Sequence, residues 1–255
     1  MFKLIFSFNL LSQLLLRLLL SIVMMAFAGC QHAPTDSTSF NNSWQQEILE
    51  YQHTLSPTHP DSIRSILSLP DEARQTVLDL FNDSSTKQIK AEKLARWLIS
   101  NDGHAMHYDI SANLNPADAF QQKRGNCLSF TILFASLAAE LGIDIQFNLV
   151  DVPDIWSTDN DHSLILYRHI NGVHKTVSNR SVFDLALELY DTRYPQKIIS
   201  EKDAVAQLHS NRAITAMQNF NYSEALHLIK LATSLSPQNE DLWVCLLYTS
   251  PSPRD

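Results

Sequence analysis

The sequence predicts an α+β fold in which one central helix packs on an antiparallel sheet and an α-helical segment follows. Residues 127–141 carry apolar side chains on nearly every face, which is typical of a helix in the centre of a core. From residue 143 the apolar period changes to two, as in a half-buried strand. From about residue 201 a helical period returns. Apolar residues make up 45% of the 255 residues, which is enough for a real core.

The N-terminus resembles the export signal of a bacterial lipoprotein. Positive charge precedes an almost continuously apolar stretch, residues 18–27, which is shorter than the roughly 20 residues of a transmembrane helix. Small residues precede Cys30, as in a lipobox. The resemblance implies a signal peptide over 1–29, lipidation of Cys30 and a periplasm-facing location in the bacterial envelope, at the outer membrane. An ordinary export signal or membrane helix with a chance cysteine is the alternative. The polar residues 30–43 are expected to form a tether.

Four helices are predicted before the central one. Proline and acidic residues at Pro70 and Asp71 suit the start of the second, and Asn115-Pro116 begins the fourth. Gly142 follows the central helix, as glycine often does after a helix C-terminus. The expected ranges of the four are 44–54, 70–81, 86–100 and 115–124.

Four strands are expected after the central helix, over 143–149, 163–167, 173–177 and 182–185. The first alternates apolar and polar residues strictly. Asn171-Gly172 is a tight-hairpin signal, so we expect the chain to turn there between the second and third strands. His169 and His174 flank this dipeptide and are therefore expected to face solvent.

The C-terminal helical segment, residues 201–244, resembles a truncated tetratricopeptide repeat. Small residues and a proline fall at the spacings of that repeat of about 34 residues, with Ile229 at its large apolar position. The small residues and the proline are Ala213, Ala225, Ala232 and Pro237. The resemblance implies closely packed helices that bind a protein or peptide partner. A generic helical hairpin is the alternative.

The cysteine pattern depends on the last eleven residues. Residues 245–255 resemble the in-frame translation of a sequencing adapter, and we expect them not to belong to the natural protein; a natural tail is the alternative. If Cys30 carries the lipid and Cys245 does not belong to the natural protein, Cys127 is the one free internal thiol. An unpaired thiol is unusual in an exported protein, because oxidising compartments pair or eliminate thiols.

Charge and motif content exclude several function classes. The formal net charge is −8 and no internal basic cluster occurs, which argues against a nucleic-acid partner. The five glycines do not gather into a phosphate-binding loop. His104 and His107 have a His-x-x-His spacing, but nothing nearby completes a ligand set. We therefore expect neither a metal nor a cofactor.

Cys127 is the candidate nucleophile. It begins the central helix, where unpaired N–H groups and the helix dipole favour a thiolate. Such a nucleophile needs a base and a group that orients the base. His162, at the entry to the second expected strand, is the candidate base. Asp184 is the candidate orienting group, because a carboxylate between apolar neighbours needs a hydrogen-bond partner. The rivals are His169, His174 and Asp191.

The order of these residues resembles that of the transglutaminase-like superfamily, which is related to papain-type proteases. That family places cysteine at a helix start, histidine at the opening of a strand and aspartate on a following strand. The run over 108–129, which includes Arg124-Gly125-Asn126-Cys127, resembles the core of the bacterial branch that is coupled to tetratricopeptide repeats. The likeness covers roughly residues 90–190 and implies a transglutaminase-like domain over 44–200.

The resemblance implies that Cys127 attacks, that His162 acts as the base and that Asp184 orients it. Gln121 is a candidate oxyanion donor, as a glutamine is in papain-like sites, and the backbone N–H of Cys127 is another. The expected activity is thiol-dependent acyl transfer or amide hydrolysis through a thioester. The alternative is a non-catalytic envelope scaffold with the same fold, since fold does not imply function.

Overall fold

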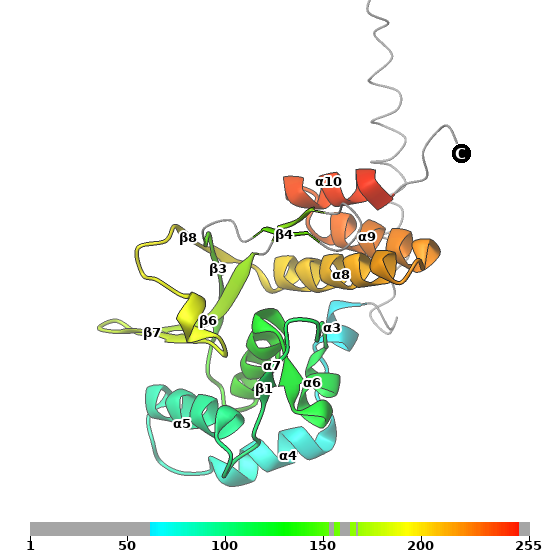
Figure 1. The fold of residues 1–255 in the computed structure, drawn as a ribbon. Helices are drawn as coiled ribbons and strands as arrows, with labels where there is room; N and C mark the ends of the chain where they lie inside the picture. The colour runs from blue at the N-terminus through cyan, green and yellow to red at the C-terminus, as the bar shows by residue number, and fades with distance from the viewer. Residues whose placement is uncertain (1–61, 153–155, 159–163, 167, 250–255) are drawn as a thin grey trace, which may run out of the picture. The chain divides into compact units, whose positions relative to one another are not determined.

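The computed structural model describes residues 62–152, 156–158, 164–166 and 168–249 (Figure 1). All of them belong to one compact unit, residues 48–255. The expected signal peptide, the tether, Cys30, the helix over 44–54 and His162 lie outside the described residues. Within the described ranges, no helix is both long enough and apolar enough to cross a bilayer.

The helices expected over 70–81, 86–100 and 115–124 are confirmed. Two of them begin at a side chain that caps the first turn: Thr86 accepts from the backbone N–H of Ile89, and Asn115 accepts from that of Asp118. A short helix precedes them. The four are α3 (Ile63–Ile66), α4 (Asp71–Leu80), α5 (Lys87–Ile99) and α6 (Pro116–Gln122).

The central helix is α7 (Cys127–Glu140), and two hydrophobic clusters meet on it. One side of α7, with Phe130 and Phe134, packs into a cluster that includes α4, α5 and α6. The other side, with Leu128 and Ile132, packs into a cluster that includes the C-terminal helices. An all-round apolar sequence is therefore explained by burial on both sides.

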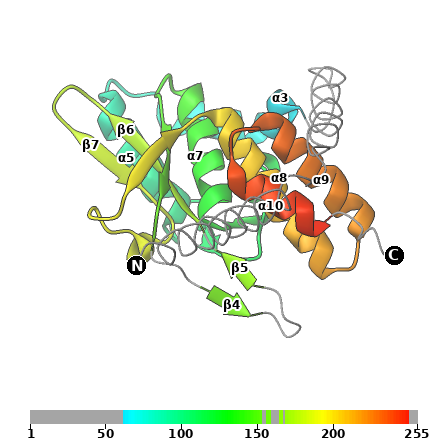
Figure 2. The same cartoon turned by 90° about the horizontal axis from the view of Figure 1, so that it is seen from above.

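The sheet is antiparallel throughout and has the order β7-β6-β3-β8. Figure 2 shows α7 beside β6, and the two elements are in contact. Two smaller pairs complete the strands: β1 (His107–Tyr108) with β2 (Arg124–Gly125), and β4 (Trp156–Thr158) with β5 (Leu164–Leu166). The four main strands are β3 (Gln146–Val150), β6 (His169–Lys175), β7 (Arg180–Phe183) and β8 (Gln196–Ile199).

The turn expected at Asn171-Gly172 is wrong, because both residues lie in the middle of β6. Packing explains the glycine: a Cβ there would lie 3.0 Å from Cγ2 of Ile145 and 3.4 Å from Cδ1 of Phe134. The chain turns instead after β6, where the N–H of Thr176 donates to the carbonyl of Asn179 at 2.8 Å. The expected strands over 163–167 and 173–177 are therefore not a hairpin, since β5 pairs with β4.

Three helices follow the sheet, as the helical period predicts: α8 (Glu201–Gln218), α9 (Tyr222–Leu235) and α10 (Glu240–Thr249). Ser200 and Asp203 form a capping box at the start of α8. Between α8 and α9 the small residues Ala213 and Ala225 are buried. Figure 1 shows α8 and α9 lying along each other, with α10 against α9.

Candidate functional site

Cys127 is the first residue of α7, and the residue before it fixes that helix end. Asn126 is the N-cap: its side chain accepts from the N–H of Ser129 at 2.9 Å, and its Nδ2 donates to Oδ1 of Asn113 at 2.7 Å. Both ends of the Asn126 amide are therefore held. Cys127 itself is half-buried and forms no disulfide among the described residues. A thiolate at this position faces the positive end of the helix dipole.

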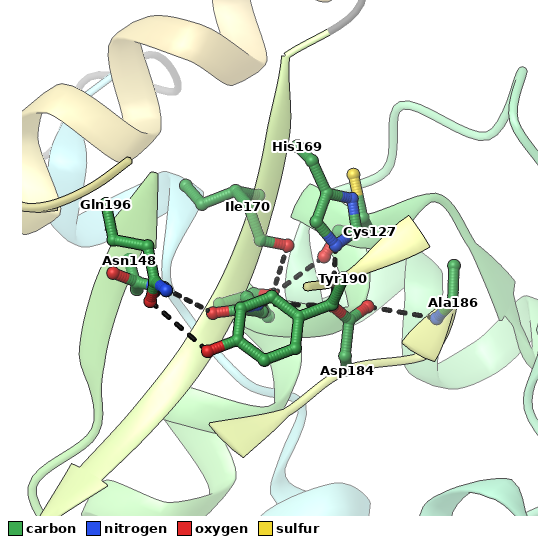
Figure 3. Close-up of polar contacts among 10 residues, drawn as sticks. Cys127, Asn148, His169, Ile170, Asp184, Ala186, Tyr190 and Gln196 are labelled. Carbon is green, nitrogen blue, oxygen red and sulfur yellow. Dashed lines mark hydrogen bonds and ion pairs between the residues drawn. The ribbon is translucent and has the colours of Figure 1, made fainter. Parts of the chain in front are cut away.

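His169, the first residue of β6, stands beside the Cys127 sulfur (Figure 3). Its Nε2 lies 2.6 Å from Oδ2 of Asp184, and its ring also hydrogen-bonds Cys127, which leaves Nδ1 for the sulfur. The His169 side chain is only 3% exposed. Burial lowers its pKa, but the hydrogen bonds and charges of the Asp184 carboxylate and the Cys127 thiolate outweigh burial and raise that pKa to about 10. The contacts thus favour a protonated His169 beside the Cys127 sulfur.

Asp184 follows β7 directly, and its carboxylate is completely buried. Besides His169, two groups donate to it: Nδ2 of Asn171 to Oδ2 at 3.3 Å, and the backbone N–H of Ala186 to Oδ1 at 2.9 Å. A buried carboxylate is costly unless it is paired and hydrogen-bonded. Asp184 meets that condition through three donors, one of which is the imidazole.

A chain of amide hydrogen bonds continues from Asp184 across the sheet. Asn148 on β3 donates through Nδ2 to Oδ1 of Asn171 at 2.8 Å and to Oε1 of Gln196 on β8 at 3.1 Å. The same Oε1 accepts from Arg180 at 2.7 Å and from the Tyr190 hydroxyl at 3.3 Å. Figure 3 shows Asn148 and Gln196 in line with the site. The site is therefore joined to the outer strand β8.

A second set of contacts joins the Cys127 end of α7 to α8. The backbone carbonyl of Asn113 accepts from Nε of Arg212 at 3.0 Å. The side chain of Asn113 donates through Nδ2 to Oγ1 of Thr215 at 3.2 Å. Because Asn113 also holds the N-cap Asn126, the loop before α6 ties the first turn of α7 to the C-terminal helices.

The structure brings together two of the three residues expected at the site. Cys127 and Asp184 meet, but the imidazole between them belongs to His169, while His162 lies outside the described residues. The expectation that His169 and His174 face solvent is wrong: they are 3% and 7% exposed. Its cause was the assumed turn at Asn171-Gly172. In a strand, His169 and Asn171 share one face, and that spacing is the signal that could have placed His169 beside Asp184.

Within the described residues, no hydrogen bond joins the remaining candidates to this group. Gln121 is exposed near the end of α6. Nδ1 of His174 donates to the carbonyl of Asp144 at 2.9 Å. Asp191 pairs with Arg193, whose hydrogen bonds lower the pKa of that carboxyl to about 2.

The His-x-x-His spacing does not form a metal centre. His104 is buried against Phe120, with its Nε2 donating to the Phe120 carbonyl at 2.9 Å, and burial lowers the pKa of this imidazole. His107 is exposed on β1. Across the ranges that the structure describes, no three His, Cys, Asp or Glu side chains are grouped so that they could hold a metal ion.

Comparisons of the chain with known protein families, with curated proteins and with solved structures found no significant match. Among the described side chains, Cys127, His169 and Asp184 form the group whose contacts suit nucleophilic chemistry.

Proposed function

We propose that this protein is a transglutaminase-like cysteine enzyme, which takes an acyl group from an amide and passes it to an amine or to water. The observation that carries the proposal is His169, which contacts both the half-buried Cys127 and the fully buried Asp184. A nucleophile, a base and a group that orients the base are the minimum for this chemistry. The three come from α7, β6 and the end of β7.

The first half of the reaction follows from the charge states of the pair. The Cys127 thiolate attacks the amide carbonyl, and the electron pair of the C=O bond moves to oxygen. The His169 imidazolium then gives its Nδ1 proton to the leaving nitrogen as the C–N bond breaks. The products are a thioester on Cys127, a free amine and a neutral imidazole that Asp184 still holds through Nε2.

The second half runs through the same groups in reverse. The neutral His169 accepts a proton from water or from an acceptor amine as that nucleophile attacks the thioester. Cleavage of the C–S bond returns the thiolate beside the imidazolium. Water gives amide hydrolysis, and an amine gives acyl transfer. The backbone N–H of Cys127 lies at the helix start and is our candidate oxyanion donor, with Gln121 as a second candidate.

The setting of the enzyme in the cell is also part of the proposal. The lipobox resemblance at Cys30 supports a lipid anchor in the bacterial envelope, and no nucleic-acid partner is proposed. The repeat-like spacing in α8 and α9 supports a tetratricopeptide-type surface for a protein or peptide partner. Amide-bearing side chains and peptides in the periplasm are substrates that such an anchored enzyme can reach.

Labelling of the full chain with iodoacetamide at pH 5.5 tests the proposal. At this pH an ordinary thiol reacts about tenfold more slowly than an ion-paired thiolate. Peptide mapping by mass spectrometry separates Cys127 from the other cysteines. We expect Cys127 to be labelled, and we expect a fluorescent primary amine to be incorporated into a glutamine-rich protein by the parent but not by Cys127→Ser. If Cys127 reacts only above about pH 8 and no product forms, the non-catalytic scaffold is the better function.

A further inference from the structure

We propose that Asn148 and Asn171 are positioning residues, which set the direction of the hydrogen bond that Asp184 receives and so fix the hold of Asp184 on His169. This inference deepens the proposed function and rests on it. It is carried by the paired amides behind the site, which take no part in the reaction steps above.

The two ends of the Asn171 amide are not interchangeable. A carboxylate only accepts hydrogen bonds, so Asn171 must present Nδ2, and not Oδ1, to Asp184. Its Oδ1 then needs a donor of its own. Asn148 supplies that donor through Nδ2 at 2.8 Å. Both amides are almost fully buried, Asn148 at 1% and Asn171 at 0% exposed, so bulk water does not substitute for either.

The backbone places these amides in register. Asn148 on β3 and Asn171 on β6 stand directly opposite each other in the antiparallel ladder. Asn171 lies two residues after His169, and alternate residues of a strand share a face. The strand pairing therefore fixes where the amides lie, and only their orientation remains to be decided.

The orientation is decided from the outer strand inwards. Oε1 of Gln196 accepts from Arg180 and from Asn148, so the Nδ2 end of Asn148 must face it. The same Nδ2 faces Oδ1 of Asn171. Asn171 is thereby held with its N–H toward Asp184. If Asn148 lost its donor, the buried Oδ1 of Asn171 would be left without a partner, and the Asn171 amide would shift from Asp184 toward another donor.

The titration of His169 reports this hold directly. Among the described residues, the ionisable side chains bonded to its ring are Cys127 and Asp184. An Asp184 carboxylate that is displaced or turned away stabilises the imidazolium less, and the pKa of His169 falls. The test is an NMR titration of the full chain with labelled histidine, in which His169→Gln identifies the resonance.

Asn148→Leu removes the donor and keeps the number and branching of the side-chain heavy atoms, and Asn171→Leu removes the bond to Asp184. We expect each to lower the pKa of His169 by about one pH unit, a tenfold loss of proton affinity. The double variant should match Asn171→Leu alone, because both act through one hydrogen bond; independent structural damage would add. Asn179→Leu, in the turn after β6, is the matched control and should leave the titration unchanged. Asn148→Val, which suits a strand, replaces Asn148→Leu if that variant does not fold.

The outcomes separate this inference from the proposed function, because the NMR titration needs no turnover. A parent Cys127 that labels at pH 5.5, together with an unchanged His169 titration in folded Asn148→Leu or Asn148→Val, overturns the positioning role and leaves the enzyme standing. A parent that does not label removes the proposed function, while the His169 titration still decides whether the amides hold Asp184. Additive effects in the double variant also overturn the positioning role.

Discussion

Replacement of His169 by glutamine keeps a polar side chain at the start of β6 but removes the imidazolium beside Cys127. The His169 ring contacts both Cys127 and Asp184, so the substitution breaks the ion pair and removes one of the three donors to the buried carboxylate. Cys127 should then behave as an ordinary thiol. The consequence is a change in how its alkylation rate depends on pH.

The magnitude follows from the thiolate population. An ordinary cysteine with a pKa of about 8.5 is thiolate in roughly one molecule per thousand at pH 5.5, whereas an ion-paired cysteine is almost entirely thiolate. A thiolate from a more acidic thiol is less nucleophilic, with a Brønsted coefficient of about 0.45. This loss of nucleophilicity offsets roughly a hundredfold of the thousandfold difference in thiolate population. We therefore expect His169→Gln to slow alkylation about tenfold at pH 5.5.

The pH profile gives a sharper signature than any single rate. The parent rate should be nearly flat from pH 5.5 to 8, and the His169→Gln rate should rise about tenfold per pH unit and overtake it near neutrality. Iodoacetamide labelling with peptide mapping measures both. His107→Gln, on exposed β1, is the matched control. Parallel profiles for parent and His169→Gln would refute the assignment, and loss of the flat profile in His162→Gln instead would return the base to His162.

Three further changes test the fold around the site. Gly172→Ala should destabilise the chain by about 1–3 kcal/mol in urea unfolding, because the added Cβ meets Ile145 and Phe134; an unchanged midpoint contradicts this. Asn126→Ala should cost about 1 kcal/mol and slow labelling of Cys127 at pH 5.5, because the cap of α7 is lost; equal labelling in a folded variant speaks against a role for the cap. The raised pKa of His169 makes its pairing stabilising below about pH 6.5, a contribution that is lost as pH rises through about 10. Urea midpoints of parent and His169→Gln should therefore converge between these pH values, and a constant gap would be the contrary result.

Local patterns were enough to predict α4, α5, α6 and α7, although the short α3 was not predicted. The start of α5 at Thr86 and that of α6 at Asn115 depend on hydrogen bonds within three residues, and such signals are visible in the sequence. The central position of α7 followed from its all-round apolar sequence. Asp184 was also identifiable, because a carboxylate between Phe183 and Leu185 needs a partner wherever the chain places it.

His169, the histidine that we propose as the base, was not identifiable by the same reasoning. Asn-Gly is a strong turn signal, but three-dimensional packing overrides it here: a Cβ at Gly172 would crowd Ile145, and Asn171 finds its partners on β3 and beyond β7. These contacts join residues far apart in sequence, so no local pattern reveals them. The turn expected at Asn171-Gly172 implied that His169 faces solvent, and His162 was therefore the favoured candidate for the base.

The two-sided packing of α7 determines whether the C-terminal helices can be removed or replaced without loss of the site. Leu128 and Ile132 lie in one cluster with Leu208 of α8 and Ile229 of α9, while Asn113 ties the same end of α7 to α8. Removal of the C-terminal helices would expose one apolar side of α7 to water. The repeat-like segment is thus not an interchangeable module, and we expect it to unfold in one transition with the site. A gene fusion or truncation near residue 200 is therefore expected to destabilise the site as well.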